Sequence, residues 1–210
     1  MSPLDGALVT RTILVATAII WVLGRTSMRE ELFQYLAYYG PAVAGGEIWR
    51  MFSLVLIHAS SFWHIGFNMY ALYIFGPAIE RSLGKLAFMT LYLMTAALGS
   101  LVVYLYSHPE TVAVGASGAI FGILGMWMYR AYRLRDTAMG QAQLRQYGFM
   151  IAINAAIPLF VPSVAWKAHV GGFLAGVLAA YVMSTVKSRK ISTGIVALIG
   201  VLAAFAPAAL

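Results

Sequence analysis

The chain has 210 residues, of which 61% are hydrophobic and only 10% are charged. A soluble globular domain carries about 25% charged residues, so this composition excludes a soluble protein and indicates an integral membrane protein. The chain has no cysteine, which excludes cysteine-ligated metal sites and leaves the redox compartment open.

Apolar stretches long enough to cross about 30 Å of hydrocarbon lie between joints marked by charged residues, glycine or proline. No repeat or linker divides the chain, so we expect one domain over residues 1–210, with a core over about 8–186 and an extra C-terminal helix over about 193–209. The fold class is an all-α polytopic membrane protein. The seven predicted spans are Leu8–Leu23, Phe62–Ile79, Leu86–Tyr106, Ser117–Tyr132, Tyr147–Val161, Ala168–Val186 and Thr193–Ala209.

The basic residues favour an orientation with the N-terminus in the cytoplasm, because ten of them then lie inside and four outside, in agreement with the positive-inside rule. The net charge of +7 therefore orients the protein, and a nucleic-acid role is disfavoured. The ten inner residues are Arg11, Arg81, Lys85, Arg130, Arg133, Arg135, Arg145, Lys187, Arg189 and Lys190; the outer four are Arg25, Arg29, Arg50 and Lys167.

The segment between the first two spans, Gly24 to Ser60, is too long for a simple turn. Its aromatic stretch around Leu32 to Tyr39 is only partly apolar, which is typical of a structure that lies in the membrane interface. We expect this segment to flank an entrance for substrate.

Polar residues mark the start of the three spans that run from outside to inside. His64, Ser117 and His169 all fall on the outer side of the membrane in this topology. Polar groups at such depth are costly and are usually functional. A serine hydroxyl becomes a useful nucleophile when a histidine accepts its proton, so we predict a catalytic dyad of Ser117 and His169. None of the seven carboxylates lies in the outer half of the fourth or sixth span, so we expect a dyad and not a triad.

Small residues on the fourth and sixth spans are spaced for close helix contact. Gly118 and Gly122 lie on one span, and Gly172 and Gly176 follow His169 on the other. Such faces let two backbones approach, which predicts that the imidazole points at a neighbouring helix.

Attack on a peptide carbonyl produces an oxyanion that needs hydrogen-bond donors already in place. The His64 ring, the Asn68 amide and the Ser117 backbone N–H are candidates. Phe121 lies one turn after Ser117 and is expected to pack against the histidine ring.

Each of these signals also has a structural interpretation. A Gly-x-Ser-Gly motif in a membrane helix is more often a packing feature, and a lone histidine can simply bond a carbonyl. Two other function classes stay open: a non-catalytic membrane adaptor that binds client helices, and a small transporter. The transporter is disfavoured because the polar residues gather at one side of the membrane and no inverted repeat is visible. The joint placement of the polar residues favours the enzyme.

As an ordered set the motifs resemble the rhomboid family of intramembrane serine proteases, over about Trp49 to Gly176. The matching pieces are Trp49-Arg50, His58, His64-Ile65-Gly66-Phe67-Asn68-Met69, Gly76 with Glu80, Gly115-Ala116-Ser117-Gly118-Ala119-Ile120-Phe121-Gly122, and Ala168-His169-Val170-Gly171-Gly172 with Gly176. Phe121 stands where some members have tyrosine, and the seventh span exceeds the minimal core.

The resemblance implies a six-helix catalytic core with Ser117 as nucleophile, His169 as general base, and His64 with Asn68 as oxyanion stabilisers. It implies cleavage of substrate transmembrane helices near their outer ends, without metal or other cofactor, by a protein whose partners are those helices and the lipid bilayer. Trp49, Arg50 and Glu80 are then structural. We expect a multi-pass protein of a bacterial plasma membrane, with its active site facing outward. The resemblance does not determine the oligomeric state.

Overall fold

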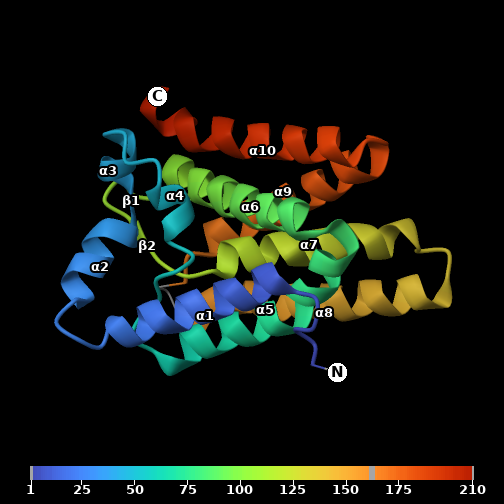
Figure 1. Cartoon of the computed structure of the whole chain (residues 1–210), viewed down its shortest axis with the longest axis horizontal. Helices are drawn as coiled ribbons and strands as arrows, with labels where there is room; N and C mark the ends of the chain where they lie inside the picture. Colours follow the sequence, from blue (N-terminus) through green and yellow to red (C-terminus); the bar gives the residue numbers. More distant parts are fainter. Residues whose placement is uncertain (1, 161–163, 210) are drawn as a thin grey trace.

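The computed structural model describes residues 2–160 and 164–209, and its helices form a bundle whose long axis lies horizontally in Figure 1. Each predicted span coincides with a helix over the described residues, except that the sixth ends at Thr185, one residue before the predicted Val186. The long helices are α1 (Leu8–Leu23), α5 (Phe62–Leu83), α6 (Lys85–Tyr106), α7 (Ser117–Arg133), α8 (Ala138–Phe160), α9 (Trp166–Thr185) and α10 (Arg189–Phe205), which continues as the 3-10 turn η1 (Ala206–Ala209).

Two helix boundaries differ from the sequence prediction in an informative way. Helix α8 begins at Ala138, nine residues before the predicted Tyr147, and so extends beyond the apolar stretch into turns that carry Gln141, Gln143, Arg145 and Gln146. The predicted last residue of that span, Val161, lies outside the described residues. Helices α5 and α6 are separated by Gly84 alone, whose φ of +84° is a conformation that favours glycine.

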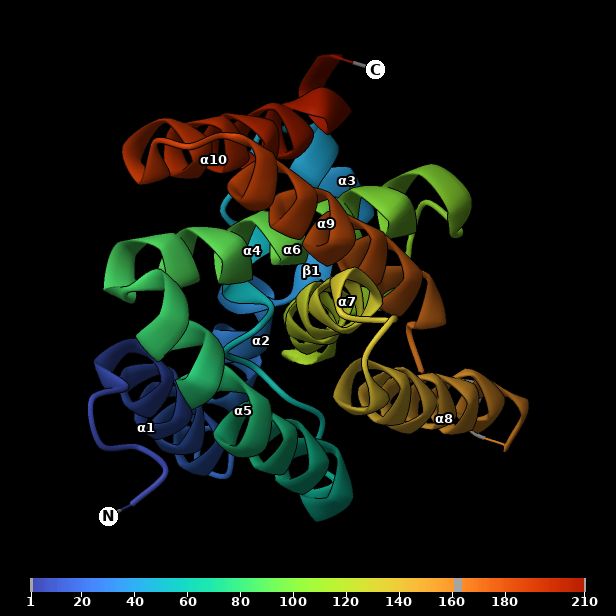
Figure 2. The same cartoon turned by 90° about the vertical axis from the view of Figure 1, so that its right-hand side faces the viewer.

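Helix α7 lies at the centre of the bundle (Figure 2). It packs most extensively on α9, and also contacts α6, α8 and α5. Helix α6 packs on α9 and is covered on another side by α10, while α1 packs on α5. The hydrophobic core includes the fully buried side chains Leu72, Phe88, Leu91, Tyr92 and Ile123.

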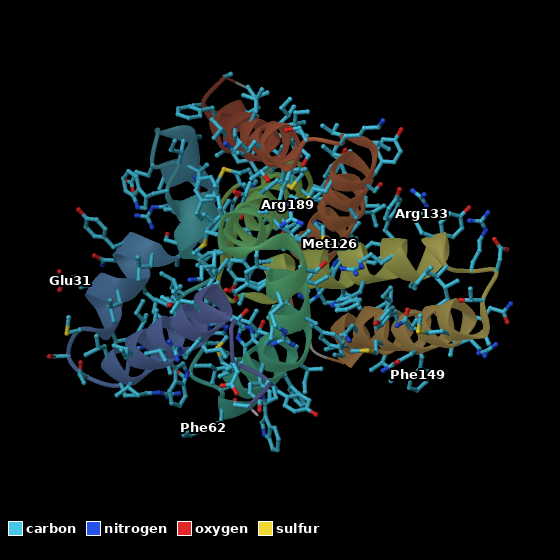
Figure 3. All side chains as sticks on the ribbon, turned by 45° about the vertical axis from the view of Figure 1, so that its right-hand side comes forward. Glu31, Phe62, Met126, Arg133, Phe149 and Arg189 are labelled. Carbon is cyan, nitrogen blue, oxygen red and sulfur yellow. The ribbon has the colours of Figure 1, made fainter. Side chains whose placement is uncertain are left out.

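The outside of the bundle is apolar, as a lipid-facing surface must be. Phe62 and Phe149 point outward and are 74% and 68% exposed, whereas Met126 lies between helices (Figure 3). By length and composition, three helices of the described chain are each suited to cross a membrane: Lys85–Tyr106, Trp166–Thr185 and Arg189–Ala209. Helix α1 is a shorter apolar helix.

The segment between α1 and α5 forms a compact cap at one end of the bundle, on the left in Figure 1. It contains α2 (Arg29–Leu36), β1 (Tyr38–Tyr39), α3 (Gly40–Ala44) and α4 (Arg50–Ser53). Strand β1 pairs in antiparallel fashion with β2 (Val112–Ala113), with Tyr38 opposite Ala113. The cap is therefore joined to the chain just before α7.

Candidate active site

Ser117 is the first residue of α7, and the turn before it is shaped by Gly115. Gly115 has a φ of +116°, and a Cβ added to it would lie only 2.7 Å from Nε2 of His64. Its N–H donates to the Leu54 carbonyl at 2.9 Å. Only glycine fits this conformation and this contact without strain. The Gly-Ala-Ser-Gly motif therefore places the serine at a helix start, directly beside a histidine of α5.

His169 lies in the first turn of α9, and its Nε2 is 2.8 Å from Oγ of Ser117. The Phe121 ring stacks on the imidazole at a centroid distance of 4.3 Å and an interplanar angle of 4°. Both members of the pair are half-buried, so neither side chain is sealed inside the bundle. This arrangement gives the hydroxyl a proton acceptor whose ring plane is fixed by stacking.

The short distance between Ser117 and His169 depends on direct backbone contact between α7 and α9. A Cβ on Gly172 would lie 1.9 Å from the Gly118 carbonyl oxygen, and one on Gly176 would lie 1.9 Å from that of Gly122. Gly125 was not among the predicted residues, but a Cβ there would lie 2.2 Å from the Phe173 carbonyl oxygen. Its spacing after Gly122 continues the same glycine face and was the available signal.

His64 and Asn68 lie one turn apart on α5. The His64 ring contacts Gly115, as described above. The Asn68 side chain is buried, and its Nδ2 donates to the His64 carbonyl at 2.7 Å. An amide nitrogen carries two hydrogens, so this bond leaves Asn68 a second one. His64 thus lies beside the serine turn, and Asn68 braces the backbone of His64.

Two hollows border the pair. A cavity of about 10 Å³, large enough for roughly one water, is lined by Ser117 and Gly118 together with Ser100 and neighbouring apolar residues. A wider pocket of about 370 Å³ is lined by Phe121, His169, Asn154 and Trp166, and by apolar residues of α8 and α9. The serine and histidine are therefore flanked by space for water on one side and by a mostly apolar pocket on the other.

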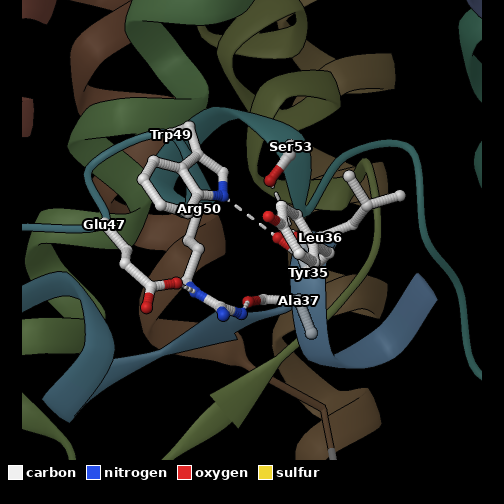
Figure 4. Close-up of polar contacts among 7 residues, drawn as sticks. All are labelled: Tyr35, Leu36, Ala37, Glu47, Trp49, Arg50 and Ser53. Atoms are coloured by element: carbon white, nitrogen blue, oxygen red, sulfur yellow. Dashed lines mark hydrogen bonds and ion pairs between the residues drawn. The ribbon is translucent and has the colours of Figure 1, made fainter. Parts of the chain in front are cut away.

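Trp49 and Arg50 fix the cap between α1 and α5 (Figure 4). Trp49 Nε1 donates to the Tyr35 carbonyl at 3.1 Å. The Arg50 guanidinium donates to the Ala37 carbonyl at 2.9 Å and to the Glu47 carboxylate at 2.6 Å. These contacts tie α4 to the chain around α2 and β1.

Glu80 ties α1 to α5. Its carboxylate is almost fully buried and accepts hydrogen bonds from the backbone N–H groups of Val9 and Thr10 at 2.8 and 2.7 Å, and from the Thr10 hydroxyl at 2.8 Å. An anion at the N-terminus of a helix also interacts favourably with the helix dipole. Among the residues that the structure describes, no group of three or more His, Cys, Asp or Glu could hold a metal ion.

Comparison with known proteins gives a consistent result. A family model described as "Rhomboid domain" matches residues 45–186. The chain is 32% identical to the rhomboid YdcA of Bacillus subtilis (strain 168) over 152 residues, which cover 72% of this chain and 75% of that protein.

Two named proteases are also similar. Rhomboid protease GlpG of Haemophilus influenzae is 29% identical over 85% of this chain and 93% of its own length. Rhomboid protease GluP of Bacillus subtilis is 32% identical over 79% of this chain, but the match spans only 32% of that longer protein. The family model and these relatives lead to one conclusion: the chain belongs to the rhomboid family of intramembrane serine proteases.

Proposed function

We propose that this chain hydrolyses a peptide bond of substrate transmembrane segments through a dyad of Ser117 and His169. The observation that carries the proposal is the 2.8 Å distance between Oγ of Ser117 and Nε2 of His169, with the imidazole stacked on Phe121. No carboxylate is needed to orient the ring, because the stacking already restricts it. We propose that the chain acts as one domain over residues 1–210.

In the reaction, Nε2 of His169 takes the Ser117 proton while Oγ attacks the carbonyl carbon of the substrate. The imidazolium then donates this proton to the departing amine, and an acyl-serine ester remains. A water molecule gives a proton to His169 and attacks the ester. As the new carboxyl end of the substrate is released, the imidazolium returns this proton to Oγ, which restores Ser117 and the neutral His169. The half-buried position of both side chains is compatible with this need for water.

We propose that three donors stabilise the oxyanion. Helix α7 begins without a side-chain cap, so the Ser117 N–H at its start is available to a bound oxygen. The His64 ring contacts Gly115 of the same turn, and Asn68, one helical turn further along α5, has a second amide hydrogen to donate. Loss of one such donor typically costs roughly 10²–10³ in turnover.

We propose that the site opens on the outer side of a bacterial plasma membrane, with the N-terminus in the cytoplasm. The basic residues support this orientation, because Arg133 lies at the end of the bundle opposite Glu31 and the outer cap (Figure 3). Cleavage would then occur near the outer ends of substrate helices. The lateral partner is the lipid bilayer, and the proposal includes neither a nucleic acid nor a cofactor.

The test is covalent labelling of the full chain, in detergent or in proteoliposomes, with a serine-directed fluorophosphonate. The wild type should be labelled at Ser117 and should cleave a transmembrane substrate. Ser117→Ala and His169→Ala should lose both activities while still accumulating in membranes. Ser184→Ala is the matched control, because this serine lies near the other end of α9 and bonds Tyr129.

Labelling at another serine, or cleavage by Ser117→Ala at the wild-type rate, would contradict the dyad. Binding of client helices without any adduct would favour the adaptor instead. Flux of a solute that survived Ser117→Ala would favour the transporter.

A further inference from the structure

His58 is a buried polar residue to which the mechanism above gives no role. It lies in the connection between α4 and α5 and is only 3% exposed. Its Nε2 accepts a hydrogen bond from the Ala116 N–H at 3.3 Å, across 58 positions of sequence. Ala116 is the residue directly before the nucleophile. The contact therefore reaches the turn that presents Ser117.

The imidazole of His58 must be neutral to accept this bond. Burial, with a smaller effect from the nearby His64, lowers the pKa of His58 to about 3, so the ring is uncharged at neutral pH. Because Nε2 is the acceptor, Nδ1 carries the proton. Nδ1 lies near the Leu56 carbonyl but has no partner in hydrogen-bond geometry among the described residues. A buried donor without a partner is costly, so packing alone does not explain a histidine here.

The same ring also supports His64. The two imidazoles lie 5.1 Å apart between centroids, at an angle of 57°. Both face Gly115: an added Cβ would lie 2.7 Å from the His64 ring and 3.9 Å from the His58 ring. The Gly115 N–H donates to the Leu54 carbonyl, four residues before His58. One short segment, 54–58, thus holds two successive N–H groups of the turn and backs the neighbouring histidine.

We propose that His58 is a positioning residue for the oxyanion side of the site, and this inference rests on the proposed function. By accepting the Ala116 N–H and backing His64, it fixes the peptide planes that aim the Ser117 N–H and the His64 ring at the developing oxyanion. His58 touches no reacting atom. Its loss lowers the rate of the chemical step and leaves substrate binding almost unchanged.

The test compares His58→Phe with His58→Gln in the full-length protein. Phenylalanine keeps the ring volume without an acceptor, whereas Oε1 of glutamine lies as many bonds from Cα as Nε2 of histidine. We expect His58→Phe to lower kcat by about 10²-fold, as a small misplacement of catalytic groups does, with KM within about twofold of the wild type. His58→Gln should recover most of this loss, and fluorophosphonate labelling rates should follow the same order.

Equal loss of kcat in both variants, or wild-type kcat in a folded His58→Phe enzyme, would overturn the inference. Absence of Ser117 labelling in the wild type would instead refute the proposed function, so the two failures are distinguishable. A measurement on the wild type covers the case in which a variant does not fold. Nitrogen-15 spectra of the histidine-labelled protein in bilayers should show a neutral His58 with protonated Nδ1 at pH 7; a protonated Nε2 would overturn the inference.

Discussion

The contact between α7 and α9 and the contact between α1 and α5 hold helices together by opposite means. In the first, glycines bring two backbones so close that no side chain fits between them. In the second, the buried Glu80 carboxylate of α5 accepts three hydrogen bonds from the first turn of α1. The first contact sets the distance between Ser117 and His169, and the second only fastens a helix to the bundle. The cleavage rate should therefore depend on the glycines between α7 and α9, whereas the free energy of unfolding should depend on the Glu80 carboxylate.

The largest effect is expected from Gly172→Ala. The new methyl group would overlap the Gly118 carbonyl oxygen, so α9 must move away from α7 and take His169 with it. A displacement of about 1 Å costs about 10²-fold in rate, and we expect at least that loss in substrate cleavage and in probe labelling. Gly148→Ala on α8 is the matched control, because a Cβ there meets nothing within 4 Å. Similar losses in both variants would argue against the close-contact explanation.

Glu80→Gln should affect stability and spare the chemistry. An amide has one acceptor oxygen where the carboxylate has two, so at least one buried N–H near the start of α1 loses its partner, at a cost of about 1–3 kcal/mol. Thermal denaturation should show a lower midpoint. Labelling of Ser117 well below that midpoint should stay within about twofold of the wild type. A folded Glu80→Gln enzyme that could not be labelled would show that the two contacts are not independent.

Phe121→Leu should have a smaller effect on rate, because it removes the ring that orients His169 but keeps an apolar side chain. Aromatic stacking is worth about 0.5–1.5 kcal/mol, which limits the loss of kcat to about tenfold. Phe121→Tyr keeps the stack and should remain near the wild-type rate. The measurement is the steady-state rate at which the wild type, Phe121→Leu and Phe121→Tyr cleave the same transmembrane substrate. Equal cleavage rates for Phe121→Leu and the wild type would mean that the stacked ring does not orient His169.

The smallest effect is expected from Gly66→Ala, on α5 between His64 and Asn68. A Cβ there meets nothing within 4 Å, although the residue is adjacent in sequence to the proposed oxyanion donors. Cleavage should be unchanged, and thermal stability should be equal to that of the wild type or up to about 1 kcal/mol higher, since alanine favours a helix over glycine. A large loss of activity would show that a change beside His64 and Asn68 in sequence disturbs them even when the added methyl group touches nothing.

Sequence reasoning located the helices well because a membrane span leaves a long apolar stretch. It placed the start of α8 late, since Gln141, Gln143, Arg145 and Gln146 interrupt the apolar stretch although the helix continues through them. It expected an interfacial structure between α1 and α5 but not its elements. Those are short, and they depend on contacts such as that of Arg50 with the Ala37 carbonyl, which no local pattern records.

The candidate site shows the same limit. Ser117, His169, His64 and Asn68 could be selected because polar groups are conspicuous in apolar helices. His58 could not be given a role, because its partner is a backbone N–H far away in the chain and carries no sequence signal.

The pairing of β1 with β2 has a consequence for how the protein is made. Ala113 follows Tyr38 by 75 residues, so β1 remains unpaired while the ribosome synthesises α5 and α6. At about 5–20 residues per second, this delay is about 4–15 s. The cap is therefore completed only after α6 has left the ribosome, and the proposed nucleophile, Ser117, is the next part of the chain to emerge.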